Sequence, residues 1–373
     1  MNVPVPLLDL HAQFAAIQGK VRPAIEDVLT SQRFIMGSQV AELERQIAAE
    51  CGAKHGIACA SGTDALLLSL KTLDLEPGDE VITTPFTFFA TAGAITNAGG
   101  TPVFVDIDPV TFNLDVDLVE AAVTSRTKGI VPVHLFGQMV PMERLAPLAA
   151  RHGLAVIEDA AQAIGARRSI ERTWRRAGEL GTTGAFSFFP SKNLGGWGDG
   201  GMIVTQDEAR AARLRKLRTH GGAKQYHHDE VGTNSRLDTL QAAVLLVKLA
   251  HLSDWNAARR LNADRYTTAL GDLDGVTTPV TDGANEHIFH QYTTRVERRD
   301  ELKQRLADRG IGSAVYYPKA LHLQPCFASL GYREGQLPEA ERACREVLSL
   351  PIYPELSEDQ QNAVIGAVRD FYS

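Results

Sequence analysis

The chain has 373 residues, enough for one large domain and one smaller domain, each with its own core. Its formal net charge of −7 comes without a basic block, which argues against nucleic acid as a partner. We expect neither a membrane span nor a signal peptide, because the long apolar stretches that both require are missing. The cysteines show no metal-ligand spacing, so we expect no metal site and a reducing, cytoplasmic environment. They are Cys51, Cys59, Cys326 and Cys344.

The first part of the chain predicts helices over 11–30 and 39–50 and a strand over 55–59. Ala60-Ser-Gly-Thr-Asp64 then leads into an apolar helix over 65–73. A strand, a glycine-containing turn and a helix N-terminus form a natural anion site, because the first N–H groups of a helix are free. An ordinary capped helix has the same pattern, so this turn alone leaves phosphate binding and simple capping both open.

Strand-like and helix-like segments alternate from residue 80 to residue 205. The predicted strands are 80–84, 102–106, 129–133, 155–158, 186–189 and 202–205. One predicted helix follows 86–89 and ends near 99, and two more cover 115–122 and 142–152. Such alternation implies crossover connections and a mainly parallel sheet of an α/β protein. Ligands of such sheets bind at the carboxyl ends of the strands. Because 61–63, 86–89, 159–162 and 187–192 all follow strands, we expect them to form one site.

The C-terminal part predicts one long helix over 238–265 and then a smaller α+β domain. Its predicted elements are strands 292–296 and 313–317 and helices 299–309 and 358–371. We therefore divide the chain into a large domain, 1–265, and a small domain, 266–373. The arginine-rich segment 167–176 is interpreted as a solvated hairpin near the site, with a nucleotide clamp as the alternative.

Lys192 lies between two apolar runs, Ala185–Phe189 and Met202–Thr205, in a loop with five glycines between residues 195 and 201. Pro190 is expected to end the first run, because proline donates no ladder hydrogen bond. Burial lowers the pKa of a lysine, and the neutral amine is the nucleophile that forms Schiff bases. A surface lysine is the alternative that this loop alone leaves open.

Asp159 ends a buried strand, where an unpaired carboxylate is costly, so it needs a cationic or N–H partner. A protonated pyridine nitrogen is such a partner. Lys192 and Asp159 together match the two fixed contacts that pyridoxal phosphate needs. The 61–63 turn would then hold the phosphate with Ser187, and Phe88 would stack on the ring. Each residue has an alternative: an arginine partner for Asp159, a core position for Phe88 and an inward strand position for Ser187.

Four motifs closely resemble the nucleotide-sugar aminotransferases of the DegT/DnrJ/EryC1/StrS family, and the resemblance extends from about Leu7 to Pro351. The motifs are Ser61-Gly-Thr-Asp-Ala-Leu66, Glu158-Asp-Ala-Ala-Gln162, Ser187-Phe-Phe-Pro-Ser-Lys-Asn-Leu194 and Gly198-Asp-Gly-Gly201. The resemblance implies a fold-type I pyridoxal-phosphate enzyme with a seven-stranded type of sheet. It also implies a homodimer with shared active sites and L-glutamate as the amino donor.

The resemblance also implies roles for single residues. Lys192 would form the Schiff base with the cofactor and act as the general acid–base. Asp159 would hold the pyridine nitrogen, and Gln162 would touch the 3-hydroxyl side. The phosphate and the ring face would be bound by Gly62, Thr63, Ser187 and Phe88.

Further residues would bind the substrate or reach the neighbouring subunit. By resemblance, Asn234 would meet the partner's cofactor phosphate and Arg236 would approach the sugar; an N-cap of the following helix is the alternative for Asn234. Tyr317 and Phe34 are further substrate-binding candidates. Tyr316 stands where relatives usually have histidine, so the role of that histidine does not carry over.

With glutamine at position 162, the chain resembles the family members that aminate C-3 of a nucleotide-linked keto sugar. These sugars are of the UDP-3-keto-N-acetylhexuronate or dTDP-3-keto-6-deoxyhexose type. A C-4 keto sugar and a keto-cyclitol stay open as acceptors. Lys192 argues against the related dehydratases, which have histidine there. A regulatory protein on this fold would need a DNA-binding region, for which the chain has neither spare length nor a basic patch.

Overall fold

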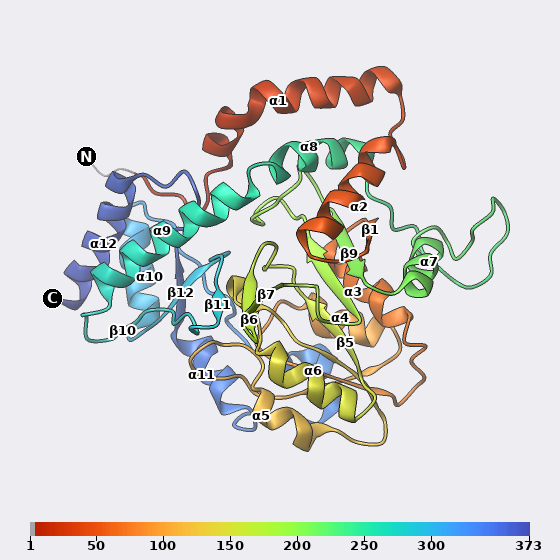
Figure 1. Cartoon of the computed structure of the whole chain (residues 1–373). Helices are drawn as coiled ribbons and strands as arrows, with labels where there is room; N and C mark the ends of the chain where they lie inside the picture. Colours follow the sequence, from red (N-terminus) through yellow and green to blue (C-terminus); the bar gives the residue numbers. More distant parts are fainter. Residues whose placement is uncertain (1–3) are drawn as a thin grey trace.

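The computed structural model describes residues 4–373 and contains a central seven-stranded sheet (Figure 1). In spatial order its strands are β1 (His55–Cys59), β9 (Gly201–Thr205), β8 (Thr183–Ser187), β5 (Ala155–Asp159), β4 (Thr127–Val131), β2 (Glu80–Thr83) and β3 (Thr101–Phe104). Strand β9 runs antiparallel to both its neighbours, and the other four pairings are parallel. The predicted mainly parallel α/β sheet is confirmed.

The helices of this part cover both faces of the sheet. They are α2 (Ser38–Glu50), α3 (Gly62–Lys71), α4 (Ala90–Asn97), α5 (Val116–Val119), α6 (Met142–Arg151) and α7 (Glu208–Leu217). Consecutive strand residues enter opposite cores: Ile130 packs in the same cluster as α2 and α6, whereas Val131 packs with α3 and α7. Burial of both faces explains why these strands are continuous apolar runs in the sequence.

A second sheet of three antiparallel strands lies in the C-terminal part. It comprises β10 (Val276–Thr277), β12 (Tyr292–Val296) and β13 (Val347–Leu350). Helices α10 (Arg299–Asp308) and α12 (Glu358–Tyr372) gather beside it, on the side of the molecule remote from α7 (Figure 1). Helix α11 (Pro338–Glu346) precedes β13. These elements share a core of their own around Tyr266, Tyr292 and Leu306, to which Val5 from the start of the chain also belongs.

Two predictions for the C-terminal half are wrong. The expected strand over 313–317 is reduced to one isolated bridge between Ala314 and Ser349. The expected long helix is two helices, α8 (Thr239–Leu249) and α9 (Leu252–Leu270). At the break the N–H of His251 bonds to Lys248, three residues back, which tightens the last turn. The division proposed at residue 265 therefore falls inside α9.

Helix α1 (Leu10–Ser31) lies alongside α8 at the edge of the molecule (Figure 1). Ile17 and Val21 of α1 pack against Val244 and Trp255. Short 3-10 turns complete the regular structure: η1 (Glu120–Ala122), η2 (Leu135–Gly137), η3 (Leu321–Leu323) and η4 (Pro325–Leu330). Among residues 4–373 we find no helix with the length and apolar character needed to span a membrane.

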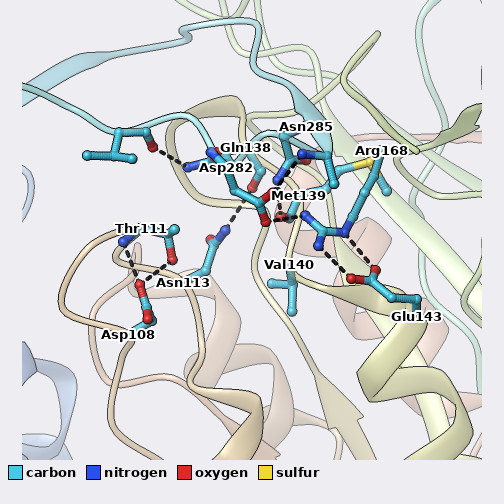
Figure 2. A network of polar contacts seen from close by, with 12 residues as sticks. Asp108, Thr111, Asn113, Gln138, Met139, Val140, Glu143, Arg168, Asp282 and Asn285 are labelled. Atoms are coloured by element: carbon cyan, nitrogen blue, oxygen red, sulfur yellow. Dashed lines mark hydrogen bonds and ion pairs between the residues drawn. The ribbon is translucent and has the colours of Figure 1, made fainter. Parts of the chain in front are cut away.

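The arginine-rich segment forms the predicted hairpin, β6 (Arg167–Ile170) and β7 (Thr173–Arg176), which pairs with β11 (Asn285–Glu286). It is not solvated throughout, because Arg168 is only 4% exposed. Figure 2 shows its guanidinium held between two carboxylates, Glu143 at 2.5 and 2.7 Å and Asp282 at 2.6 Å. Arg168 thus joins the hairpin to α6 and to the loop before β11.

Replacing Arg168 with methionine should lower the free energy of unfolding by about 2 kcal/mol, because two partly buried carboxylates lose their shared cation. Urea unfolding measures the change. Arg175→Met is the control in the same hairpin, since the Arg175 guanidinium that pairs with Glu179 is much more exposed than that of Arg168, and we expect less than about 0.5 kcal/mol there. Equal losses in the two variants would contradict a special role for the buried arginine.

Candidate active site

A cavity of 450 Å³ opens at the carboxyl edge of the central sheet. The loops after β1, β2, β5 and β8 all line it, so the four segments that follow these strands converge as predicted. The predicted site residues in its wall are Gly62, Thr63, Phe88, Asp159, Gln162, Ser187, Lys192 and Tyr317.

The N-terminus of α3 forms one end of this cavity. Ser61 is the N-cap, and its hydroxyl accepts the N–H of Asp64 at 3.1 Å. The backbone N–H groups of Gly62 and Thr63 lie in the first turn of the helix, where no helix carbonyl can accept them. They are therefore available to an anion. Simple capping and an anion cradle are therefore compatible at this turn. A Cβ on Gly62 would lie 2.6 Å from the Cβ of Ser187, so only glycine lets the helix start approach the end of β8 this closely.

Gly62→Ala should weaken the binding of pyridoxal phosphate about tenfold or more, because Ser187 or the helix start must move out of the cradle. Titration of the cofactor-free protein with pyridoxal phosphate measures the effect. Gly19→Ala, at a helical glycine with no atom within 4 Å of the added methyl group, should leave the affinity unchanged. An unchanged affinity in the Gly62 variant would show that the cradle does not hold the phosphate.

Asp159 is buried at the end of β5, with 5% of its surface exposed. Its carboxylate accepts the Thr91 hydroxyl at 2.8 Å and the N–H of Ala161 at 3.2 Å. The alternative of an arginine partner is therefore wrong. Burial raises the pKa of Asp159, and the two hydrogen bonds together with the nearby Lys192 oppose this only in part. The acid therefore fits a protonated ring nitrogen, which would compensate its charge.

Lys192 lies in the loop after β8, and burial lowers its pKa to about 8. The negative charge of Asp159 opposes that shift only in part. The strand ends at Ser187 rather than at Pro190, because the Ser187 hydroxyl accepts the N–H of Phe189 in place of a ladder partner. The backbone N–H of Lys192 then turns back to the Phe189 carbonyl at 2.9 Å. The loop thus presents an amine that is partly neutral near pH 8.

Gln162 has its amide orientation fixed from two sides. Its Oε1 accepts the N–H of Phe136 at 2.7 Å, and its Nε2 donates to the Tyr317 hydroxyl at 3.1 Å. Burial raises the pKa of Tyr317, so this hydroxyl stays protonated. One N–H of Gln162 remains for a ligand in the cavity.

The backbone around Phe136, which bonds to Gln162, is itself held in place by hydrogen bonds. Asn113 accepts the N–H of Leu135 and donates to the Gln138 carbonyl, both at 3.0 Å. The side chain of Gln138 reaches the carbonyl of Val280 and the N–H of Asp282 (Figure 2). The network around Arg168 thus continues to the backbone that orients Gln162.

Three predicted residues lie outside this cavity. Asn234 is exposed, and its side chain accepts a hydrogen bond from Arg236 at 3.0 Å. The N-cap alternative for Asn234 is wrong, because α8 begins at Thr239 with Asp238 as its N-cap. Phe34 is 37% exposed on the segment between α1 and α2. The roles assigned to Asn234 and Arg236 therefore stay predictions that depend on a second subunit, and the substrate-binding role of Phe34 stays a prediction as well.

Sequence reasoning missed three polar residues of the site. Thr91 is a buried residue of α4 that donates to Asp159, and its hydroxyl also contacts that of Thr87, four residues earlier in the loop before α4. His290 lines the cavity and contacts Asn193, the residue after Lys192. The spacing of the two threonines was a usable signal, whereas nothing in the local sequence of His290 points to a site 97 residues earlier in the chain.

Solved structures with the same fold define the class of protein. S. venezuelae DesV, solved in complex with a ketimine intermediate, matches with a TM-score of 0.96, 45% identity and 99% coverage of both chains. NtdA from Bacillus subtilis, solved with bound cofactor PMP, matches with a TM-score of 0.88 and 33% identity, covering 98% of this chain and 82% of NtdA. The fold is that of the pyridoxal-phosphate aminotransferases.

The chain belongs to the DegT/DnrJ/EryC1/StrS aminotransferase family, whose model matches residues 16–369. A relative from Acidithiobacillus ferrooxidans, a UDP-N-acetyl-3-dehydro-alpha-D-glucosamine 3-aminotransferase, is 45% identical over 99% of this chain and 98% of its own. A Geobacillus stearothermophilus relative with the name pleiotropic regulatory protein is 54% identical over 99% of this chain and 98% of its own. The family resemblance inferred from the four motifs is confirmed.

Proposed function

We propose that this enzyme uses pyridoxal phosphate to transfer the amino group of L-glutamate to the C-3 keto group of a nucleotide-linked sugar. The acceptor is of the UDP-3-keto-N-acetylhexuronate or dTDP-3-keto-6-deoxyhexose type. The observation that carries the proposal is the pairing of Lys192 and Asp159 in one cavity beside a helix N-terminus. The A. ferrooxidans relative, which is a 3-aminotransferase by name, supports the C-3 position.

Pyridoxal phosphate, when bound, supplies an electron-withdrawing ring that makes the carbon next to the transferred nitrogen acidic. Lys192 would hold the cofactor covalently and move the proton between the two carbon positions. Asp159 would keep the ring nitrogen protonated, and the N–H groups of Gly62 and Thr63 would bind the phosphate. Gln162 would donate its remaining N–H to the cofactor's 3-hydroxyl side.

A homodimer would complete the site. The segment after α7 projects from the body of the subunit (Figure 1), and it exposes Tyr226 to 88% and Val231 to 86%. Asn234 and Arg236 follow directly, with side chains outside their own subunit's cavity. Exposed apolar side chains of this kind mark a contact surface. We propose that this segment enters the partner subunit, where Asn234 meets the phosphate and Arg236 meets the sugar.

Isotope transfer tests this function directly. The protein, loaded with pyridoxal phosphate, is incubated with L-[15N]glutamate and a nucleotide-linked 3-keto sugar. We expect 15N at C-3 of the sugar and an equal amount of 2-oxoglutarate. The name of the G. stearothermophilus relative suggests a regulatory role for that relative. A purely regulatory protein would release neither product.

The lowered pKa of Lys192 predicts the pH dependence of cofactor attachment. Only the neutral amine attacks an aldehyde, so the attachment rate should rise as pH increases through about 8 and level off above it. Stopped-flow absorbance with the cofactor-free protein measures this rate. A rate that keeps rising to pH 10 would indicate an exposed, unperturbed lysine.

A further inference from the structure

Asn193 anchors the loop that carries Lys192 to two distant parts of the chain. It is 4% exposed and directly follows the lysine. Its Nδ2 donates to Oδ1 of Asn256 in α9 at 2.8 Å and to the carbonyl of Ile288 at 3.3 Å. The stretch that follows is rich in glycine and offers few side chains, so Asn193 is the side-chain anchor nearest to the lysine.

The orientation of each group in this chain of contacts is determined by backbone carbonyls. Asn256 Nδ2 donates to the Ile164 carbonyl at 3.1 Å, which leaves Asn256 Oδ1 as an acceptor. Asn193 must therefore present Nδ2 to Asn256 and Oδ1 to His290. His290 Nδ1 lies 3.1 Å from that oxygen, so Nδ1 carries the proton.

His290 is a neutral imidazole with its proton on Nδ1, because its other nitrogen, Nε2, faces the amide nitrogen of Gln291 at 3.5 Å, which can only donate. It is 5% exposed, and burial lowers its pKa well below the ordinary value, assisted by the nearby cations Lys192 and Arg259. A second proton on Nε2 would place a cation in the cavity of Lys192. The Nδ1–H group is thus the one polar hydrogen that His290 offers, and Asn193 receives it.

We propose that Asn193 and His290 are positioning residues for Lys192, with the Nδ1–H of His290 locking Asn193 and hence the lysine loop. The inference rests on the proposed role of Lys192 in binding the cofactor. The lysine and the residue after it are then both held: the Phe189 carbonyl accepts the backbone N–H of Lys192, and Asn193 is bonded to α9, to residue 288 and to His290. A fixed amine reaches a bound aldehyde faster than a mobile one.

Two substitutions of His290 separate its nitrogens. His290→Asn places an amide N–H near the position of Nδ1 and can still bond to Asn193, whereas His290→Gln places its amide near the position of Nε2 and abandons that bond. The readout is the rate at which the cofactor-free protein attaches pyridoxal phosphate, followed by absorbance and by the mass increase after borohydride reduction. Asn193→Ala is the reference for complete loss of the anchor, and melting temperatures report folding.

We expect His290→Asn to attach the cofactor within about threefold of the unchanged rate, and His290→Gln and Asn193→Ala to be about tenfold or more slower. The reverse order of the two histidine variants would overturn the proposal, because the cavity side of the ring would then matter. Equal rates in both variants, fast or slow, would overturn it as well. An unchanged protein that never attaches pyridoxal phosphate would instead contradict the proposed function.

Discussion

Lys192→Ala should lower kcat/KM for transamination by about a thousandfold or more, equivalent to about 4 kcal/mol of transition-state stabilisation. The variant loses both the amine that would bind the cofactor and the group that would move the proton. Steady-state kinetics measure the loss. Borohydride reduction followed by mass spectrometry should find no covalently bound cofactor in the variant.

A second lysine with a lowered pKa, Lys248, provides a control. Burial also lowers the pKa of Lys248 to about 8, but its Nζ donates to the Gly195 carbonyl at 2.7 Å and it lies outside the Lys192 cavity. Lys248→Met should therefore keep covalent attachment of the cofactor. Attachment that persists in Lys192→Ala and disappears in Lys248→Met would show that Lys248, and not Lys192, binds the cofactor.

Asp159→Asn should lower kcat/KM by about 100-fold to 1,000-fold and weaken cofactor binding, because a neutral amide cannot hold the ring nitrogen protonated. The same change removes a buried carboxylate with a raised pKa, so the cofactor-free variant should melt no lower than the unchanged protein. Kinetics, cofactor titration and melting curves together measure these effects.

Thr91→Val is the corresponding control. It removes one hydrogen bond to Asp159 and leaves the charge, so we expect a decrease of kcat/KM of about tenfold at most. If the two variants lost activity equally, the hydrogen bond and not the charge of Asp159 would be the important feature.

The sequence predicted the parts of the fold that local patterns determine. The bounds of β1 and β12 agree with the predicted strands, because β1 is a mainly apolar run before a turn and β12 consists largely of β-branched and aromatic residues. The break between α8 and α9 was not predictable in the same way, since neither Ala250 nor His251 is a helix breaker. There, a tightened turn redirects the chain toward the second core.

For the site, residue types and strand ends were enough to bring Lys192, Asp159 and the Gly62 turn together. The sequence could not predict how Gln162 is oriented, because its partners Phe136 and Tyr317 lie 26 and 155 residues away. Arg168 was expected on a solvated hairpin for the same reason: its carboxylate partners are 25 and 114 residues distant. Long-range hydrogen bonds of this kind appear only when the fold is known.

The measurement that tests the central claim most directly compares two acceptors. The protein is first converted with L-glutamate to the amino form of its cofactor, the glutamate is removed, and a matched pair of 3-keto and 4-keto nucleotide sugars is offered separately. We predict that only the 3-keto sugar restores the absorbance of the lysine-bound cofactor. Restoration by the 4-keto sugar alone would contradict the proposed C-3 specificity, and restoration by neither would contradict a nucleotide-sugar acceptor.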